Sequence, residues 1–279
     1  MDLYRISAGD GVAWITGASA GIGRDLALKM ARNGYKVIAS ARSEDKLKAL
    51  EEESADLSGS IHAAVCDVTD RAAMDKVVTD IEQNHGPIRL AVFNAGNYWP
   101  TEGEALNIDK FIKTYEINVF GVLHGLVPVV ERMKRHGKGQ VALVASVSGY
   151  SGLPAASAYG ASKAAINNMA ESLKFDFDKI NIRIQVVNPG FIDTPLTEKN
   201  EFDMPFLMPV DKAVDRMISG FEGGGFEITM PRRFTYMLKL LLFLPHSAYF
   251  WLMKRSTKWN ERKLEFGDTA KASTIRAGA

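Results

Sequence analysis

The sequence predicts an α/β protein whose core is a doubly wound parallel sheet of about seven strands with helices on both faces. Three observations lead to this prediction. Short apolar runs alternate with helical segments, glycines cluster directly after the first apolar run, and no repeat or Pro/Ser-rich linker divides the chain. Strands that alternate with helices form parallel sheets, and such sheets bind ligands at the carboxyl ends of their strands.

The expected elements follow one another along the chain. Apolar runs predict strands near residues 12–16, 36–41, 61–66, 89–94, 140–146, 182–188 and 226–229. Helical patterns predict helices near residues 21–33, 43–55, 70–85, 107–136, 157–179 and 209–222. We therefore expect one domain over residues 1–230, a C-terminal appendage over residues 231–263 and a flexible tail over residues 264–279.

Composition excludes several classes of protein. The 279 residues are 46% hydrophobic, which is sufficient for one sizeable core. The net charge of +1 gives no reason to expect nucleic acid as a partner. Cys66 is the single cysteine and the five histidines are scattered, so neither an internal disulfide nor a metal site is expected. No long apolar run precedes the first strand, which predicts a cytoplasmic protein without a secretory signal.

A phosphate-binding turn is predicted after the first strand. Gly17, Gly21 and Gly23 stand between that strand and a helical segment. Glycines let the backbone approach a pyrophosphate, and the helix N-terminus supplies N–H groups and the positive end of a dipole. The spacing is G-x-x-x-G-x-G rather than G-x-G-x-x-G, and a simple turn is the alternative. The flanking strand and helix favour a dinucleotide site.

A candidate acid/base pair lies downstream. Tyr159 and Lys163 are four residues apart, so on a helix they share one face. A cation beside a phenol favours the phenolate and lowers a pKa that is ordinarily near 10, which makes Tyr159 a candidate general acid/base. The same spacing occurs on ordinary solvated helices, so the interpretation depends on the glycine turn upstream.

Together these motifs resemble the short-chain dehydrogenase/reductase family over roughly residues 10–230. Further matches are N-A-G at residues 94–96 and P-G-x-x-x-T at residues 189–194. The resemblance implies a Rossmann-like fold and an oxidoreductase acting on CH–OH groups with NAD(P)+ as acceptor. It implies four catalytic residues, which are Asn118, Ser146, Tyr159 and Lys163. It implies cofactor contacts from Gly17, Ser19, Gly21, Ile22, Gly23, Asp67, Val68, Asn94, Ala95, Gly96, Tyr159, Lys163, Pro189, Gly190, Ile192 and Thr194.

The resemblance also implies a role for each catalytic residue. Tyr159 donates the proton, Ser146 bonds the carbonyl oxygen, and Lys163 lowers the phenol pKa and holds the nicotinamide ribose. Asn118 positions a water behind the lysine, and a helix kink or the satisfaction of backbone groups is its alternative role. Ser148 is the alternative to Ser146. Asn94 is interpreted as a structural clamp between strands, Ile192 as a backbone donor to the nicotinamide amide, and Thr194 as a partner of that amide or the phosphates.

The cofactor's phosphate state is predicted from the residues after the second strand. NAD-binding folds place an acid there for the ribose hydroxyls, whereas an arginine suits the 2′-phosphate of NADP. This chain has Ala41 and then Arg42, so NADP(H) is preferred and NAD(H) stays possible. An arginine that only begins a solvated loop is the alternative. Ala20 stands where part of the family carries a second basic residue.

The chain differs from a minimal family member in its C-terminal segment, residues 231–263. It holds eight Lys/Arg and one acid, and fourteen residues without formal charge apart from His246 lie between Lys239 and Lys254. A spanning helix needs about twenty apolar residues, and Pro245 is expected to divide this run into two helices. Three interpretations stay open: an anchor on an anionic membrane surface, a lid over a lipophilic pocket, and an oligomer interface or ordinary core.

The sequence thus predicts an NADP(H)-dependent oxidoreductase that reduces a ketone or oxidises a secondary alcohol. Its substrate is expected to be lipophilic, because similar tails occur on family members that reduce lipid ketones. The family also implies a homo-oligomer, and the tail implies a cytoplasmic protein held peripherally on a membrane. The alternative is a non-catalytic NADP(H)-binding or membrane-recruited scaffold protein with the same fold.

Overall fold

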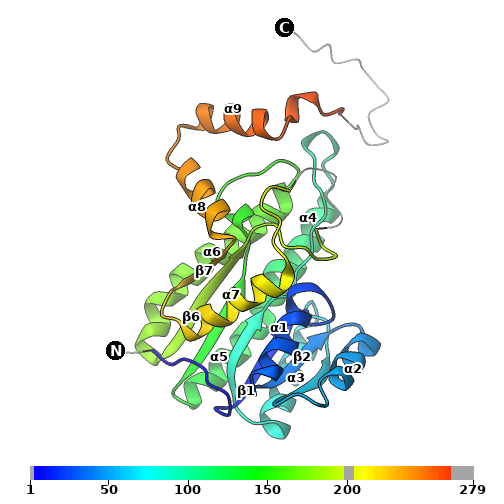
Figure 1. Ribbon diagram of the computed structural model, residues 1–279, viewed down its shortest axis with the longest axis vertical. Helices are drawn as coiled ribbons and strands as arrows, with labels where there is room; N and C mark the ends of the chain where they lie inside the picture. Colours follow the sequence, from blue (N-terminus) through cyan, green and yellow to red (C-terminus); the bar gives the residue numbers. More distant parts are fainter. Residues whose placement is uncertain (1–2, 198–203, 265–279) are drawn as a thin grey trace.

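The predicted parallel sheet is the centre of the molecule (Figure 1). The computed structural model describes residues 3–197 and 204–264. The strands are β1 (Val12–Thr16), β2 (Lys36–Ala41), β3 (Ser60–Val65), β4 (Ile88–Phe93), β5 (Gly139–Val144), β6 (Ile182–Pro189) and β7 (Glu227–Met230). They form one seven-stranded sheet in the order β3-β2-β1-β4-β5-β6-β7, and every neighbouring pair is parallel. The predicted fold class is confirmed.

The strand order reverses between β1 and β4. From β1 the chain adds strands toward β3, and from β4 it adds strands toward β7. A doubly wound sheet has its ligand crevice at such a switch point, outside the carboxyl ends of the strands. The glycine turn follows β1 and residues 94–96 follow β4. Both segments therefore lie at the crevice.

Helices cover both faces of the sheet, and each face has its own core. One core is shared by α1 (Gly21–Arg32), α2 (Glu44–Glu53) and α7 (Val210–Glu222). The other core is shared by α3 (Arg71–Asn84), α5 (Gly121–Arg135) and α6 (Ser157–Phe177). Along β1, Ala13 and Ile15 face the first core while Val12 and Trp14 face the second. Because successive side chains alternate and both faces are covered, a central strand is apolar throughout.

The single helix predicted over residues 107–136 is wrong in one respect. Helix α4 (Ile108–Tyr115) passes through a π-helical segment, Glu116–Phe120, before α5 begins. Asn118 lies in that segment and is completely buried. Single π-helical turns inside α-helices occur frequently at functional sites. Apolar periodicity does not reveal the wider turn, because it reports which residues are buried and not the local hydrogen-bond pattern.

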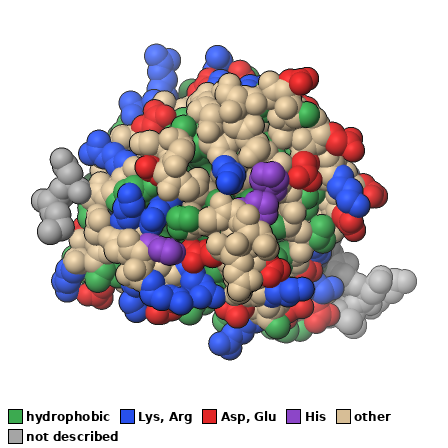
Figure 2. All heavy atoms as spheres, turned by 90° about the horizontal axis from the view of Figure 1, so that it is seen from below, with side chains coloured by type: hydrophobic (Ala, Val, Ile, Leu, Met, Phe, Trp, Pro, Cys, Tyr) green, Lys and Arg blue, Asp and Glu red, His purple; other side chains and the backbone are tan. Residues whose placement is uncertain are grey.

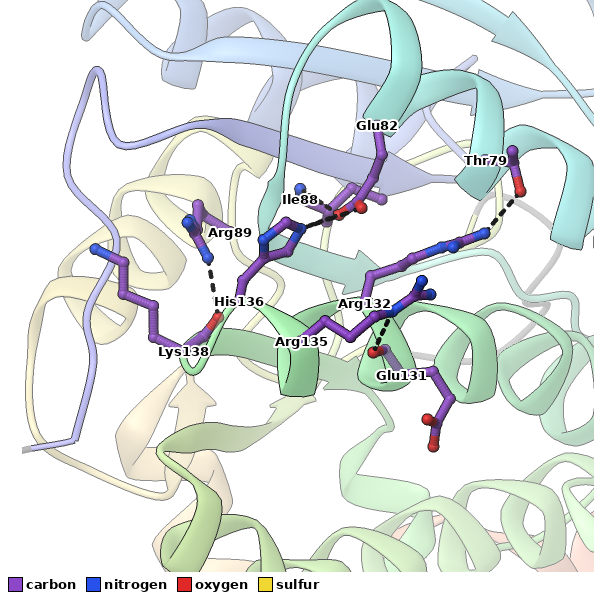
Figure 3. Close-up of polar contacts among 9 residues, drawn as sticks. All are labelled: Thr79, Glu82, Ile88, Arg89, Glu131, Arg132, Arg135, His136 and Lys138. Carbon is purple, nitrogen blue, oxygen red and sulfur yellow. Dashed lines mark hydrogen bonds and ion pairs between the residues drawn. The ribbon is translucent and has the colours of Figure 1, made fainter.

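The end of the sheet opposite α8 and α9 is held by polar contacts (Figure 3). The ring of His136 lies 3.1 Å from the carboxylate of Glu82, which also accepts a bond of 3.3 Å from the backbone N–H of Ile88. Arg89 donates to the carbonyl of Lys138 at 3.2 Å. The same end, seen in Figure 2, mixes basic and acidic side chains, and its hydrophobic side chains form only small scattered groups. It is an ordinary charged surface.

Two short helices lie beyond the other end of the sheet (Figure 1). They are α8 (Arg232–Leu241) and α9 (His246–Ser256), and Pro245 immediately precedes α9. The predicted division of this run at Pro245 is confirmed. Within the described part of the chain no helix has the length and apolarity to cross a membrane. The predicted flexible tail, residues 264–279, lies outside the described residues except for Leu264.

Candidate active site

The floor of the crevice is made by the loops after β1 and β4. The side-chain amide of Asn94 donates to the carbonyls of Thr16 at 3.1 Å and Gly17 at 3.3 Å. The Thr16 hydroxyl accepts from the backbone N–H groups of Asn94 and Ala95, both at 3.1 Å. A Cβ at Gly17 would lie 2.7 Å from the Cα of Ala95, and the φ of Gly17 is +69°. Only glycine allows this approach.

A cleft of about 430 Å³ opens on this floor. Most of the predicted cofactor residues line it: Gly17, Ser19, Gly21, Ile22, Arg42, Asp67, Val68, Asn94, Ala95, Gly96 and Thr194. The remaining predicted residues are not part of its lining: Gly23, Tyr159, Lys163, Pro189, Gly190 and Ile192. Gly23 packs beneath the turn against the Asn94 side chain, and Ile192 is buried with its carbonyl accepting from the Thr194 and Thr197 hydroxyls. Their cofactor contacts stay predictions.

One end of the cleft is basic. Arg42 lines it together with two residues that the sequence reasoning missed, Ser43 and Lys46. The Arg42 guanidinium is largely exposed and lies 3.9 Å from the carboxylate of Asp67. Lys46 follows Arg42 by four residues and lies in the first turn of α2. The helix predicted over residues 43–55 already placed Lys46 near its start. Two cations and a hydroxyl at this point suit a phosphate monoester.

Tyr159 and Lys163 lie on α6 next to the end of β5. The Lys163 ammonium lies 5.6 Å from the centre of the Tyr159 ring and donates to the Val144 carbonyl at 2.8 Å. Lys163 is 3% exposed. A Cβ at Gly96 would lie 3.3 Å from both the Lys163 ammonium and the Asn118 side-chain oxygen. The structure therefore brings the predicted tyrosine, lysine and asparagine to one place.

Burial sets the charge states of this pair. It raises the pKa of Tyr159 to about 12, and a hydrogen bond with Ser146 acts in the opposite direction. It lowers the pKa of Lys163 to about 8. The expected lowering of the phenol pKa by Lys163 stays a prediction, and in this structure burial has the larger effect on that pKa. A protonated phenol at neutral pH is a proton donor.

The serine of the site is Ser146, directly after β5. Its hydroxyl is hydrogen-bonded to Tyr159, whereas the Ser148 hydroxyl donates to Ser146 at 3.0 Å. The backbone N–H of Ser148 also donates to Ser146, at 3.2 Å, and Ser146 lies 3.4 Å from the Pro189 carbonyl. Both serines are buried. Ser148 thus orients Ser146, which favours Ser146 as the residue that meets a substrate oxygen.

Asn118 is used as a clamp. Its side-chain oxygen accepts from the Asn97 backbone N–H at 2.8 Å, and its amide donates to the Asn97 carbonyl at 3.0 Å. The amide also donates to the Ser162 hydroxyl at 3.1 Å, which ties the π-helical segment to α6. The alternative role considered for Asn118, satisfaction of backbone groups, is thus present. A water relay through this residue stays a prediction.

Two further residues of the site were missed by sequence reasoning. Tyr98 packs its ring edge-on against Tyr159 with centroids 5.3 Å apart, and its hydroxyl donates to the Ala155 carbonyl at 3.4 Å. Asn97 is the backbone partner of Asn118. Both follow the N-A-G motif directly, and that proximity was the only available signal.

A carboxylate joins the serine loop to the C-terminal helices. Glu227 on β7 accepts from the Tyr150 hydroxyl and, at 2.8 Å, from the Asn188 amide, and it forms an ion pair with Lys239 of α8. The Lys239 ammonium also lies 5.2 Å from the centre of the Tyr150 ring. Burial alone would raise the pKa of Glu227, but bonds from Lys239, Tyr150 and Asn188 hold it below its ordinary value. We call these four residues the Glu227 cluster.

Replacing Glu227 with glutamine should destabilise the protein by about 1–3 kcal/mol, because Lys239 and the Tyr150 hydroxyl, both half-buried, lose their charged partner. Since the folded pKa of Glu227 lies below its unfolded value, this contribution is present at neutral pH and is lost as the pH falls. Urea unfolding of Glu227→Gln measures the loss. Glu52→Gln, on the exposed side of α2, is the matched control, and an equal effect in both variants would contradict the assignment.

Comparison with known proteins shows which family this chain resembles. Residues 11–204 match the family model described as short chain dehydrogenase. An uncharacterized oxidoreductase of Myxococcus xanthus is 32% identical over 237 residues, covering 85% of this chain and 94% of that protein. The 3-oxoacyl-[acyl-carrier-protein] reductase FabG of Thermotoga maritima is 35% identical over 188 residues, covering 67% of this chain and 76% of that protein.

Solved structures show the same fold. The alcohol dehydrogenase from the archaeon Thermococcus sibiricus, complexed with 5-hydroxy-NADP, has a TM-score of 0.72 and 23% identity, covering 79% of this chain and 95% of that one. With the family match above, the chain belongs to the short-chain dehydrogenase family. It is an oxidoreductase that acts on CH–OH groups.

Proposed function

We propose that this protein is an NADP(H)-dependent reductase that converts a hydrophobic ketone to a secondary alcohol. The observation that carries the proposal is that two features lie together at the carboxyl edge of the sheet. One is the partly buried Tyr159 with the buried Lys163 and Ser146 beside it, and the other is a cleft that is basic at Arg42 and Lys46. A non-catalytic scaffold has no use for a buried, charged lysine, whose desolvation is costly.

The cleft fits a dinucleotide with a 2′-phosphate. The glycine floor leaves room for a pyrophosphate close to the backbone, and the N-terminus of α1 points N–H groups at it. Arg42, Ser43 and Lys46 stand where the adenosine ribose of such a cofactor would end, and Ala41 supplies no acid for a free 2′-hydroxyl. The Thermococcus relative was solved with 5-hydroxy-NADP, which supports the same class of cofactor here.

Replacing Arg42 with alanine should weaken NADPH binding about tenfold and leave NADH binding unchanged, because the lost bond is to the 2′-phosphate alone. The effect is at the small end of the range for charged hydrogen bonds, since Arg42 is largely exposed. Nucleotide fluorescence titration in the absence of substrate measures both dissociation constants. Lys46→Ala should act in the same direction, and Arg216→Ala on α7 is a distant control. An equal loss of NADH affinity would contradict the cofactor assignment.

The chain's own groups perform the acid half of the reaction. When bound, a reduced nicotinamide supplies the hydride that adds to the carbonyl carbon. Tyr159 gives its phenolic proton to the carbonyl oxygen, and the product is the neutral alcohol. Ser146 donates a hydrogen bond to the same oxygen as negative charge develops there. Lys163 stabilises the phenolate that remains and thereby assists the transfer.

The substrate region is apolar. Val147, after the catalytic serine, packs against Phe234 and Leu238 of α8, and Tyr150, Phe191 and Leu241 extend this cluster. The ring of Tyr98 packs edge-on against Tyr159. A wall of this composition favours a hydrophobic, lipid-like ketone. In this proposal segment 231–263 closes the site on one side and also contacts a membrane at the cytoplasmic surface.

The proposal includes self-association, which is common in the family. Phe120, Val127 and Phe175 leave large exposed apolar side chains on the π-helical segment, α5 and α6. Such side chains support a contact between copies of the chain. Light scattering of the purified protein gives the assembly mass.

The proposed function is tested by NADPH oxidation with ketones that range from short polar to long-chain. We expect turnover that increases with chain length and is faster with NADPH than with NADH. Absence of turnover with every ketone, together with tight NADPH binding, would exclude the reductase and favour alcohol oxidation or a scaffold. The reverse assay, with NADP+ and secondary alcohols, separates those two.

A further inference from the structure

The C-terminal helices expose an unusual amount of apolar surface. Helices α8 and α9 and the turn between them leave eight large hydrophobic side chains more than a third exposed: Tyr236, Met237, Leu240, Leu242, Phe243, Leu244, Phe250 and Trp251. Single exposed apolar residues are normal, but a contiguous group marks an interaction site. We call this group, with the basic residues beside it, the outer surface of α8–α9.

We propose that this outer surface docks on an anionic lipid bilayer. The inference specifies the membrane contact included in the proposed function, but it rests on surface structure and not on the reaction. It concerns a helix pair that lies in the membrane interface, since α8 has 10 residues and α9 has 11. Interfacial helices of this kind bury one apolar face and keep basic residues at the headgroups.

The inner sides of the two helices are already occupied. Phe234 and Leu238 of α8 are buried against Val147. On α9, Tyr249 is buried and its hydroxyl donates to the Gly152 carbonyl at 2.7 Å. Beyond α9, Arg262 donates to the Glu104 carboxylate at 2.7 Å. Each helix is therefore attached to the body at these contacts, and the exposed apolar residues lie outside them.

The outward residues follow helical spacing. Tyr236 and Leu240 are one turn apart on α8, and Phe243 lies at the tip of the turn with 86% of its surface exposed. On α9, Phe250 and Trp251 are 52% and 63% exposed. Residues spaced by three or four share a helix face, so Tyr236 and Leu240 lie on one face of α8. Phe250 and Trp251 are neighbours in the sequence and are both exposed on α9. Aromatic and leucine side chains are those that enter the headgroup boundary.

Basic side chains accompany this apolar face. Lys254 and Arg255 follow the exposed aromatics by one turn, and the Arg255 guanidinium lies 5.8 Å from the centre of the Trp251 ring. Arg232, Arg233 and Lys258 are also exposed. Among residues 231–264, which the structure describes throughout, Glu261 is the one acid. Each basic residue near an anionic membrane contributes about 1 kcal/mol to binding.

Charge distinguishes a bilayer from a second copy of the chain. In a two-fold contact the same patch meets itself, so the basic residues of one copy would face those of the other. An anionic bilayer instead offers opposite charge over the whole patch. The opposite end of the molecule shows mixed charges and no comparable apolar group (Figure 2). Docking would also orient the apolar wall of the substrate region, which includes Phe234, toward the source of a lipid-like ketone.

The test is co-sedimentation of the full-length protein with sucrose-loaded vesicles, without substrate. We expect at least tenfold stronger partitioning onto phosphatidylcholine vesicles that contain phosphatidylserine than onto pure phosphatidylcholine. The double variant Phe243→Ser/Trp251→Ser and the double variant Lys254→Gln/Arg255→Gln should each lose about tenfold or more, which corresponds to about 1.4 kcal/mol. Exposed residues elsewhere provide matched controls, Val65→Ser/Ile180→Ser for the first and Lys179→Gln/Lys212→Gln for the second.

Two results would overturn the proposal. One is that wild-type protein stays in the supernatant at low salt when the vesicles contain phosphatidylserine. The other is a loss of vesicle binding in the control variants that equals the loss in the patch variants. If the patch joins two copies instead, vesicle binding will be absent and Phe243→Ser will lower the assembly mass in sedimentation velocity. Turnover of a short water-soluble ketone should be unchanged in Phe243→Ser/Trp251→Ser, which separates failure of docking from failure of the proposed function.

Discussion

Replacing Tyr159 with phenylalanine should lower kcat for ketone reduction by about a hundredfold to ten-thousandfold, the range expected for the loss of a general acid. The substitution removes only the hydroxyl, so the edge-on packing with Tyr98 is kept. Because the ring is retained beside Lys163, NADPH binding should change little. Stopped-flow NADPH oxidation measures kcat, and fluorescence titration measures cofactor affinity in the same preparation.

The neighbouring phenol provides the control. Tyr98 is partly buried like Tyr159 and burial raises its pKa to about 12, but its hydroxyl is bonded to the Ala155 carbonyl. Tyr98→Phe should therefore keep most of the activity and change mainly KM. If kcat fell equally in Tyr159→Phe and Tyr98→Phe, the loss could not be assigned to a proton donated by Tyr159. Retained activity in Tyr159→Phe would remove the mechanism proposed here.

Replacing Lys163 with methionine should abolish turnover and yet stabilise the cofactor-free protein. Lys163 is almost completely buried, and its ammonium donates a hydrogen bond to a neutral backbone carbonyl, that of Val144. Its pKa falls from 10.5 to about 8. At about 1.4 kcal/mol per pKa unit, the charged lysine destabilises the fold by about 3 kcal/mol. The lost hydrogen bond offsets about 1 kcal/mol of this, so we expect a net gain of about 2 kcal/mol.

The pH dependence gives this prediction a second readout. The folded pKa of Lys163 lies below its unfolded value, so between about pH 8 and 10.5 the unfolded chain binds more protons. Wild-type stability should therefore gain a contribution as the pH rises through that window, whereas Lys163→Met should lack it. Urea unfolding without cofactor, near pH 7 and near pH 10, measures both. The exposed substitution Lys212→Met should leave the wild-type pH dependence intact, and a similar flattening there would contradict the assignment to Lys163.

Much of this fold was predictable because its signals are local. The run from Val12 to Ile15 is apolar because both faces of β1 are covered, and that pattern is visible in the sequence alone. The glycine turn and the Tyr159–Lys163 spacing are equally local. Together they placed the cofactor cleft and the acid/base pair at the carboxyl ends of the strands.

The parts that were missed depend on contacts between distant segments. Glu227 lies in an ordinary short strand, and its role appears only when Tyr150 and Lys239 are brought to it from 77 residues before and 12 residues after. Asn118 was chosen by resemblance, but its wider helical turn and its hydrogen bonds to the backbone of Asn97 were not predicted. Lys46 is one of several lysines on an exposed helix until the fold turns it toward the cleft.

The Glu227 cluster gives the C-terminal segment a structural role in the active-site loop that its amphipathic composition does not indicate. Lys239 is the counter-ion of a carboxylate that also holds Tyr150, four residues after Ser146. A chimera that exchanges residues 231–263 with those of a relative must therefore carry a cation at position 239, or the graft will disturb the serine it was meant to leave alone. Segment 231–263 can therefore be exchanged only together with the loop that follows Ser146.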